Sequence, residues 1–233
     1  MFQSWTHLTL VHWRYQASEI RPLLPGRLSL DTYGGMAWIG LTPFIVQDLR
    51  ARFTPPIPWI SRFPEMNVRT YVTGPDGERG IWFFTLDADR LAAVLGARLT
   101  YGLPYRWAGM RVLPEADTVT YLSKRHLPFA PGYCRMNVRI GQSIVAGELD
   151  RFLTARFRLY TLLRGRLAFA QVEHEPWPLH AAKLLQLDQD VVHCSGLPVA
   201  DGIPLAHYSP GVHVRVARPR FVAEAAAFTP AQA

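Results

Sequence analysis

Three polar residues alternate along one predicted strand and could form the wall of a binding site. Glu65, Asn67 and Arg69 are separated by single apolar residues, so in a strand all three project to one side. Met66 and Val68 then face the other side. A glutamate can act as a general acid or base, and an arginine can bind a carboxylate bidentately. We expect this stripe to line a pocket; the alternative is a solvated strand face with an ordinary Glu–Arg pair.

A second group of candidates surrounds the turn at 102–104. Tyr105 could donate a phenolic hydrogen bond, and Arg106 could bind a carboxylate through two parallel hydrogen bonds. Arg98 and Tyr101 precede the turn and could line the same cavity. The alternative is that Tyr105 packs in the core while Arg106 extends along the surface to solvent. The predicted substrate-binding set, with Glu65 as the catalytic candidate, is Glu65, Asn67, Arg69, Arg98, Tyr101, Tyr105 and Arg106.

Other motifs that carry chemistry are missing from the sequence. It contains no GxGxxG or GxxxxGK[ST] loop, so we expect no nucleotide or other cofactor. Its two cysteines form no CxxC pair, and the histidines of segment 173–180 lack the HExxH spacing, so we expect no metal site. His12, Tyr160 and His174 are weaker candidates for the pocket.

Period-two apolar patterning dominates the chain and predicts a mostly β protein with few, short helices. Strands are predicted at 5–15, 28–33, 35–44, 67–72, 80–86, 118–126, 133–140, 156–160, 167–175 and 213–216. Helices are predicted at 19–21, from 87 or 89 to 96, at 147–153 and after Pro178. Turns at 34–35 and 74–77 predict hairpins, and the proline-rich stretch 51–64 predicts a loop. We expect one domain over 1–220 and a disordered tail over 221–233.

The net charge of +7 and the pI of about 9.8 suggest a nucleic-acid partner, but the distribution of charge argues against one. Arginines are scattered singly among apolar residues, and the densest cluster, 156–166, alternates as a half-buried strand would. We favour a solvated strand face there. No apolar run is long enough to cross a bilayer, and the N-terminus has no signal-peptide pattern, so we expect a cytoplasmic protein without a membrane partner.

Several segments resemble the YqjF-like family of uncharacterised bacterial proteins. The resemblance covers nearly the whole chain and rests on segments 63–72, 80–87 and 97–110, extended by 12–14, 23–25, 172–177 and 207–209. More remotely, the family is similar to acetoacetate decarboxylase-like proteins, through Glu65, which matches a pocket glutamate, and through Arg98 to Arg106. This resemblance implies an α+β fold in which a cone-shaped antiparallel β-barrel with a few flanking helices encloses a small-molecule pocket.

The resemblance also shows what this chain lacks. In acetoacetate decarboxylase-like enzymes the turn is followed by two lysines, and the first forms a Schiff base with the substrate ketone; Tyr105 and Arg106 stand there instead. A phenol has no nitrogen for an imine, and a guanidinium stays protonated. The only lysines, Lys124 and Lys183, lie elsewhere in the sequence. We therefore predict that the protein is not a Schiff-base decarboxylase.

Three hypotheses about function follow from these residues. The leading one is a barrel that binds a small anionic organic molecule. The second is an enzyme of lyase or hydratase type with Glu65 as general acid or base. The third is a basic non-catalytic scaffold or nucleic-acid-binding protein. The sequence leaves open the identity of the ligand and whether the chain forms a homo-oligomer.

Overall fold

The computed structural model describes residues 1–129, 131–199 and 202–223. The strands of this part are β1 (Phe2–Gln16), β2 (Ser29–Leu30), β3 (Met36–Arg50), β4 (Phe63–Thr73), β5 (Arg79–Ala88), β6 (Tyr105–Pro114), β7 (Thr118–Arg125), β8 (Tyr133–Ser143), β9 (Arg158–Leu163), β10 (Arg166–His174), β11 (His180–Gln189), β12 (Leu205–Val216) and β13 (Arg220–Phe221). The helices are α1 (Ala17–Ile20), α2 (Leu91–Tyr101) and α3 (Glu148–Thr154), with short 3₁₀ turns at Arg21–Leu23 and His193–Ser195.

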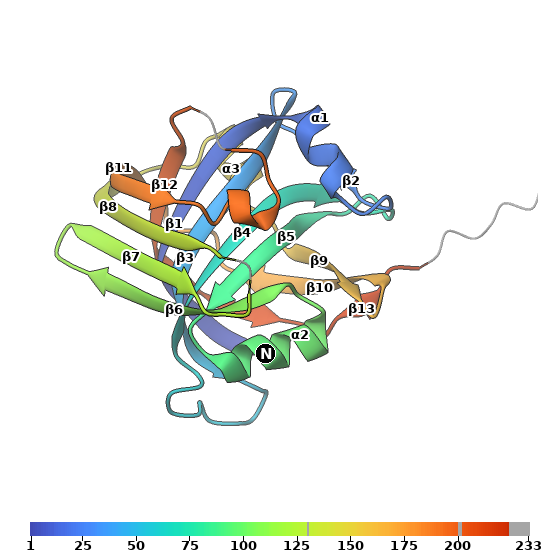
Figure 1. The fold of residues 1–233 in the computed structure, drawn as a ribbon, viewed down its shortest axis with the longest axis horizontal. Coiled ribbons are helices and arrows are strands. Elements are labelled where there is room, and N and C mark those ends of the chain that lie inside the picture. Colours follow the sequence, from blue (N-terminus) through green and yellow to red (C-terminus); the bar gives the residue numbers. More distant parts are fainter. Residues whose placement is uncertain (130, 200–201, 224–233) are drawn as a thin grey trace, which may run out of the picture.

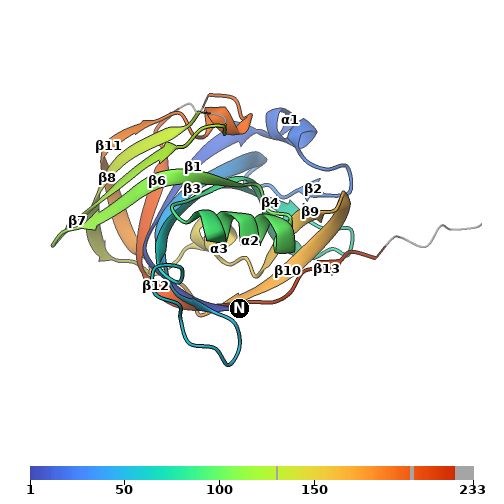
Figure 2. The ribbon, with the colours of Figure 1, turned by 60° about the horizontal axis from the view of Figure 1, so that its bottom comes forward.

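All of these strands belong to one thirteen-stranded sheet that curls back on itself (Figure 1). Pairing in the order β5–β4–β3–β1–β12–β10–β9 returns to β5 and closes a first ring. Pairing in the order β5–β6–β7–β8–β11–β12–β1–β3–β4 also returns to β5 and closes a second ring. The two rings share β5, β4, β3, β1 and β12. Strand β5 pairs in parallel with both β6 and β9, while the other pairings are antiparallel. In Figure 2, α2 lies across the opening of the first ring.

Strand β4, which both rings share, is buried on both faces. Every residue of β4 from Glu65 to Val72 is buried, although the sequence alternates polar and apolar side chains there. Met66 and Val68 pack into the apolar core of the second ring. The polar residues between them must therefore face the interior of the first ring.

Much of the predicted secondary structure is confirmed. The turn at 74–77 joins β4 and β5 as an antiparallel hairpin, and the short helix predicted at 147–153 is α3. The strands predicted at 118–126, 133–140, 156–160 and 167–175 correspond to β7, β8, β9 and β10. The fold class is also confirmed at this level: a mostly antiparallel sheet with three α-helices.

Two predicted elements are wrong, and the bounds of a third differ. The segment predicted as a helix after Pro178 is β11, because pairing with β8 and β12 overrides its helix-forming composition. The strand predicted at 28–33 shrinks to β2 and pairs with β4, so it forms no hairpin with β3. The helix predicted from Asp87 or Asp89 to Gly96 is confirmed as α2, but it begins at Leu91 and ends at Tyr101, followed by the left-handed cap Gly102 with φ of 67°. Asp87 stays in β5 because an internal ion pair holds it.

The C-terminal segment is described in part. Phe221, the first residue of the expected tail, pairs with β10 as part of β13, whereas residues 224–233 lie outside the described residues. Among the described helices, none is long and apolar enough to cross a membrane.

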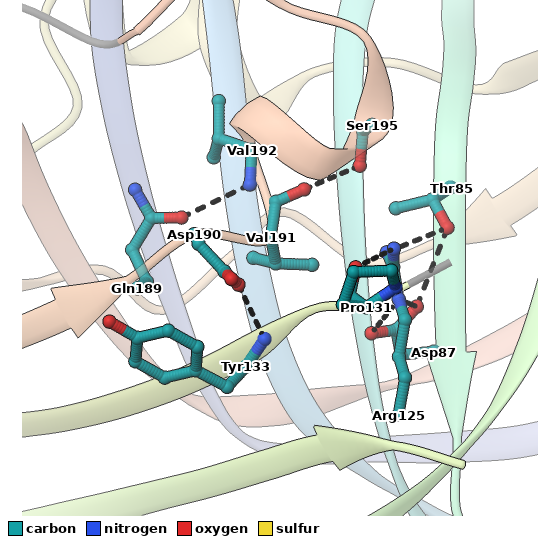
Figure 3. Close-up of polar contacts among 10 residues, drawn as sticks. All are labelled: Thr85, Asp87, Arg125, Pro131, Tyr133, Gln189, Asp190, Val191, Val192 and Ser195. Carbon is teal, nitrogen blue, oxygen red and sulfur yellow. Dashed lines mark hydrogen bonds and ion pairs between the residues drawn. The ribbon is translucent and has the colours of Figure 1, made fainter. Parts of the chain in front are cut away.

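An ion pair between Asp87 and Arg125 ties β5 to β7. Both side chains are about 1% exposed, and the Arg125 Nε lies 2.9 Å from an Asp87 oxygen. Arg125 also donates to the Thr85 hydroxyl at 3.1 Å and to the Pro131 carbonyl at 3.4 Å (Figure 3). Because each charge has lost its water, each depends on the other to offset the cost of burial.

Removing one member of this pair should therefore destabilise the fold strongly. We expect Asp87→Ala to lower the free energy of unfolding by about 3–5 kcal/mol, because it leaves the Arg125 guanidinium buried and unpaired. Urea denaturation followed by circular dichroism measures this. Asp117→Ala is the matched control, since Asp117 forms an exposed pair with Arg139 at 3.7 Å and should lose less than about 1 kcal/mol. Equal losses of unfolding free energy in Asp87→Ala and Asp117→Ala would contradict the conclusion that the Asp87–Arg125 pair is the one on which stability depends.

Candidate functional site

A cavity of about 370 Å³ lies inside the first ring. Residues from all seven strands of that ring line it, among them Leu8, Thr42, Phe83, Leu159, Val172 and Val216. Leu153 and Thr154 of α3 line the end that is buried, and residues of α2 line the opposite end. The volume falls within the range of about 300–1,000 Å³ that is typical of pockets for small organic ligands.

The polar stripe of β4 lines this cavity as the alternation predicts. Glu65, Asn67 and Arg69 all face the cavity, and each is less than 8% exposed. Strand geometry places Arg69 about 13 Å beyond Glu65, with Asn67 midway. The Tyr105 hydroxyl, from the start of β6, donates a hydrogen bond of 2.8 Å to Glu65 Oε2. Glu65 and Tyr105, which are far apart in sequence, therefore form one acid–phenol pair.

Burial controls the protonation of this pair. It raises the pKa of Glu65 to about 7, against an ordinary value near 4.5, and the hydrogen bond from Tyr105 opposes that rise only in part. Burial, together with the charge of Glu65, also raises the pKa of Tyr105 well above its usual value, so the phenol keeps its proton. A carboxyl group whose pKa lies near neutrality can both donate and accept a proton under physiological conditions.

Arg69 lies deeper in the cavity, where its buried guanidinium interacts with the Tyr71 side chain but has no acidic partner among the described residues. Within the part of the chain that the structure describes, no carboxylate lies within 4.0 Å of its guanidinium, and its Nε makes no hydrogen bond. Asn67 Oδ1 and the hydroxyl of Thr42, the residue paired with Asn67 on β3, are also buried without partners. Polar groups buried in this way are costly unless something satisfies them.

The stem of Arg69 packs over a glycine beside His12. A Cβ atom on Gly40 would lie 3.1 Å from the His12 ring and 3.4 Å from Arg69 Cγ, so the missing side chain makes room for both. The Tyr71 hydroxyl donates to the Leu153 carbonyl at 2.8 Å, so it accepts from His12 Nε2 at 2.7 Å. Burial and the charge of Arg69 lower the pKa of His12 well below its usual value, so the imidazole is neutral.

Arg156 is a second buried arginine at the closed end, and the sequence analysis did not propose it. Its Nη1 lies 2.7 Å from Asp31, its Nε donates to the Phe152 carbonyl at 2.8 Å, and its guanidinium stacks on Tyr71 at 5.0 Å. Its Nη2 has no partner. The predicted solvated strand face is therefore wrong at Arg156, which is 4% exposed; no local sequence signal separates it from the exposed arginines around it.

The structure does not bring all the predicted site residues together. Tyr101 and Tyr105 line the cavity, and the Tyr101 hydroxyl donates to the Ala217 carbonyl at 3.0 Å. Arg98 and Arg106 do not line it: both guanidinium groups lie outside, 5.8 and 5.7 Å from the ring of Phe129. Arg106 follows Tyr105 in β6, and adjacent strand residues point to opposite faces. The Arg106 side chain is therefore not placed to contact a ligand carboxylate in this cavity. The arginine of the predicted set that lines the cavity is Arg69.

The structure also shows where the weaker candidates and the two lysines lie relative to the cavity. His174 lines the cavity and contacts the ring of Trp177, His12 lies beside the stem of Arg69, and Tyr160 packs in a separate apolar cluster with Leu24 and Leu28. Neither Lys124 nor Lys183, both in the described part of the chain, lines the cavity, and both are exposed. The cavity wall therefore contains neither of the two lysines.

Comparison with known proteins gives matches over most of the chain. Residues 2–213 match the DUF2071 family, described as "Uncharacterized conserved protein". The chain is 40% identical over 211 residues to the "Uncharacterized protein YqjF" of Bacillus subtilis (strain 168), covering 90% of this chain and 87% of that protein. The resemblance to YqjF-like proteins is thus confirmed.

Solved structures with this fold include enzymes. The enduracididine biosynthesis enzyme MppR complexed with pyruvate matches with a TM-score of 0.65 at 13% identity, covering 94% of this chain and 89% of that one. Acetoacetate decarboxylase from Legionella pneumophila matches with a TM-score of 0.63 at 13% identity, covering 96% and 88%. At this identity the likeness shows the fold alone, and it confirms the predicted acetoacetate decarboxylase-like fold.

The raised pKa of Glu65 predicts how stability depends on pH. Between its ordinary pKa of 4.5 and the folded value of about 7, the unfolded chain loses a proton that the folded protein keeps. The free energy of unfolding contributed by Glu65 should therefore fall as pH rises through this window, by on the order of 3 kcal/mol. Urea denaturation at a series of pH values, for the original protein and Glu65→Gln, measures the difference.

The Glu65→Gln variant should lack this decline, since an amide does not titrate. Glu78→Gln is the control, because Glu78 is an exposed residue of the β4–β5 turn, and its curve should run parallel to that of the original protein. If the Glu65→Gln curve also runs parallel, Glu65 does not titrate near neutrality.

Proposed function

Because the chain belongs to the DUF2071 family and has an acetoacetate decarboxylase-like fold, we propose that its cavity binds a small organic carboxylate without forming a Schiff base. The observation that carries the proposal is the buried guanidinium of Arg69 at the closed end, which has no acidic partner among the described residues and whose Nε makes no hydrogen bond. Such a cation is costly to bury alone, and a ligand carboxylate would supply the missing negative charge. Two charge-assisted hydrogen bonds to a guanidinium also fix the orientation of the ligand.

The neighbouring groups support an anion there. Arg156 contributes an unpartnered Nη2, and Asn67 and Thr42 contribute further polar atoms without partners. Arg69 and Arg156 both lie close to the Tyr71 side chain, so their positive charges are near each other. The fold can hold such a ligand, since the related enzyme MppR is known in complex with pyruvate, a carboxylate. The absence of a lysine from the cavity wall argues against imine chemistry.

A second candidate function is catalysis of lyase or hydratase type. The observation that favours it is Glu65, whose pKa of about 7 and hydrogen bond from Tyr105 suit a general acid or base. A carboxylate fixed at Arg69 would extend toward Glu65, which could then remove or deliver a proton on the body of the ligand.

Replacement of Arg69 tests the binding proposal. In a thermal-shift screen of small carboxylates that includes acetate, butyrate and pyruvate, a ligand at about a hundred times its Kd should stabilise the original protein by about 2.7 kcal/mol. We expect Arg69→Met to lose this stabilisation. We also expect the unliganded variant to be at least as stable as the original protein, because a buried unpaired charge has been replaced by an apolar side chain of similar length.

The control is Arg14→Met, which removes an exposed arginine of β1 and should leave ligand stabilisation intact. Ligand stabilisation that survives in Arg69→Met would refute the role of Arg69. A screen in which no carboxylate raises the melting temperature of the original protein would refute the proposal as a whole.

Turnover separates the second candidate from simple binding. If Glu65 is the general acid or base, a carboxylate that binds should be converted by the original protein, and Glu65→Gln should lower kcat by about 10²–10⁴-fold while the Kd changes little. Mass spectrometry of the incubated ligand detects the product of a lyase reaction or of a hydratase reaction. Tight binding without any conversion would assign the protein to the first class.

A further inference from the structure

The lining residues show which end of the cavity is open. Ile60, Ala92, Gly96 and Thr100 line the cavity and are exposed, whereas Thr42 and Arg156 line it and are buried. The mouth therefore lies between α2 and the loop before β4. Figure 2 shows α2 across this opening.

Polar atoms that lack partners are concentrated at the closed end. There Thr42 Oγ1, Asn67 Oδ1, Arg69 Nε and Arg156 Nη2 make no hydrogen bonds. Nearer the mouth, Glu65 and Tyr105 satisfy each other through their hydrogen bond of 2.8 Å. The buried polar atoms that a ligand could satisfy therefore lie on the wall from Asn67 inward, beyond the Glu65–Tyr105 pair.

Between the mouth and the closed end the wall is mainly apolar. Aromatic and aliphatic side chains from all seven strands of the first ring and from the segment before β11 form it, including Trp5, Phe44, Phe83, Leu86, Leu159 and Trp177. Outside the cavity, Phe53 and Trp59 of the loop before β4, and Leu95 and Leu99 of α2, are more than half exposed, and none of the four lines it. Arg90 joins the two elements by donating to the Trp59 carbonyl at 2.8 Å.

We propose that the ligand is an amphipathic monocarboxylic acid, with its carboxylate at Arg69 and an aliphatic or aromatic body that runs past Glu65 to the mouth at α2. This inference rests on the proposed function and adds the class and direction of the ligand. A volume of about 370 Å³ exceeds what an acid of two or three carbons fills, and an apolar body would remove the remaining wall from water.

The affinity of a homologous series tests the class of ligand. Isothermal titration with straight-chain acids from acetate to decanoate should show Kd falling by about fourfold for each added methylene until the cavity is full, which corresponds to about 0.8 kcal/mol per methylene. Octan-1-ol, which has the chain but no charge, should bind at least tenfold more weakly than octanoate. Equal affinity for acetate and octanoate would overturn this inference and leave the proposed function intact. Failure of every acid to bind would overturn both.

A substitution at the mouth tests whether the body of the ligand runs from Arg69 toward α2. A Cβ on Gly96 would meet no atom within 4 Å, so a large side chain at this lining position can enter the mouth without displacing its neighbours. We expect Gly96→Phe to weaken decanoate binding at least tenfold and to leave butyrate unchanged. Leu99→Phe, on the outward face of the same helix, should change neither. Undiminished decanoate binding by a folded Gly96→Phe variant would show that the chain does not run toward α2.

Discussion

The two-residue period of β4, a strand buried on both faces, is the constraint on which the rest of the structure depends. Because hydrogen bonds close a ring on each side of the strand, its two faces belong to different interiors, one filled by apolar side chains and one containing the cavity. A slip of one residue in register would move Glu65, Asn67 and Arg69 into the apolar core and Met66 and Val68 into the cavity. The neighbouring pairings that fix this register therefore also fix the composition of the site.

The sequence was sufficient where one local rule decides the outcome. Alternation placed Glu65, Asn67 and Arg69 on one face, and turn chemistry placed the β4–β5 hairpin. Prediction from the sequence failed where contacts between residues far apart in the chain determine the secondary structure or the burial of a side chain. Asp87 has the composition of a helix start but is held in β5 by Arg125, and β11 is a strand because β8 and β12 pair with it. Arg156 could not be separated from other arginines, because its burial depends on Asp31, 125 residues away.

The cavity combines features that a protein optimised only for stability would avoid. The stability of the folded state is reduced by the Arg69 guanidinium, which has no acidic partner among the described residues, and by the raised pKa of Glu65. It is reduced further by the Asn67 amide oxygen and the Thr42 hydroxyl, which lack hydrogen-bond partners. Such violations are expected where a protein must interact with something other than itself. They occur here on an acetoacetate decarboxylase-like fold, in which the Tyr105 hydroxyl donates a hydrogen bond to Glu65. The shared fold thus supports a different arrangement of charges.

Division of one strand between two interiors also has a consequence for evolution. Substitutions at the odd-numbered positions of β4 alter the chemistry of the cavity without changing the volume of the apolar core, and substitutions at the even-numbered positions do the reverse. Ligand preference and core packing can therefore diverge independently among descendants of one ancestor. A lineage with this architecture can exchange the polar groups that meet its ligand while the mutations that govern folding accumulate separately.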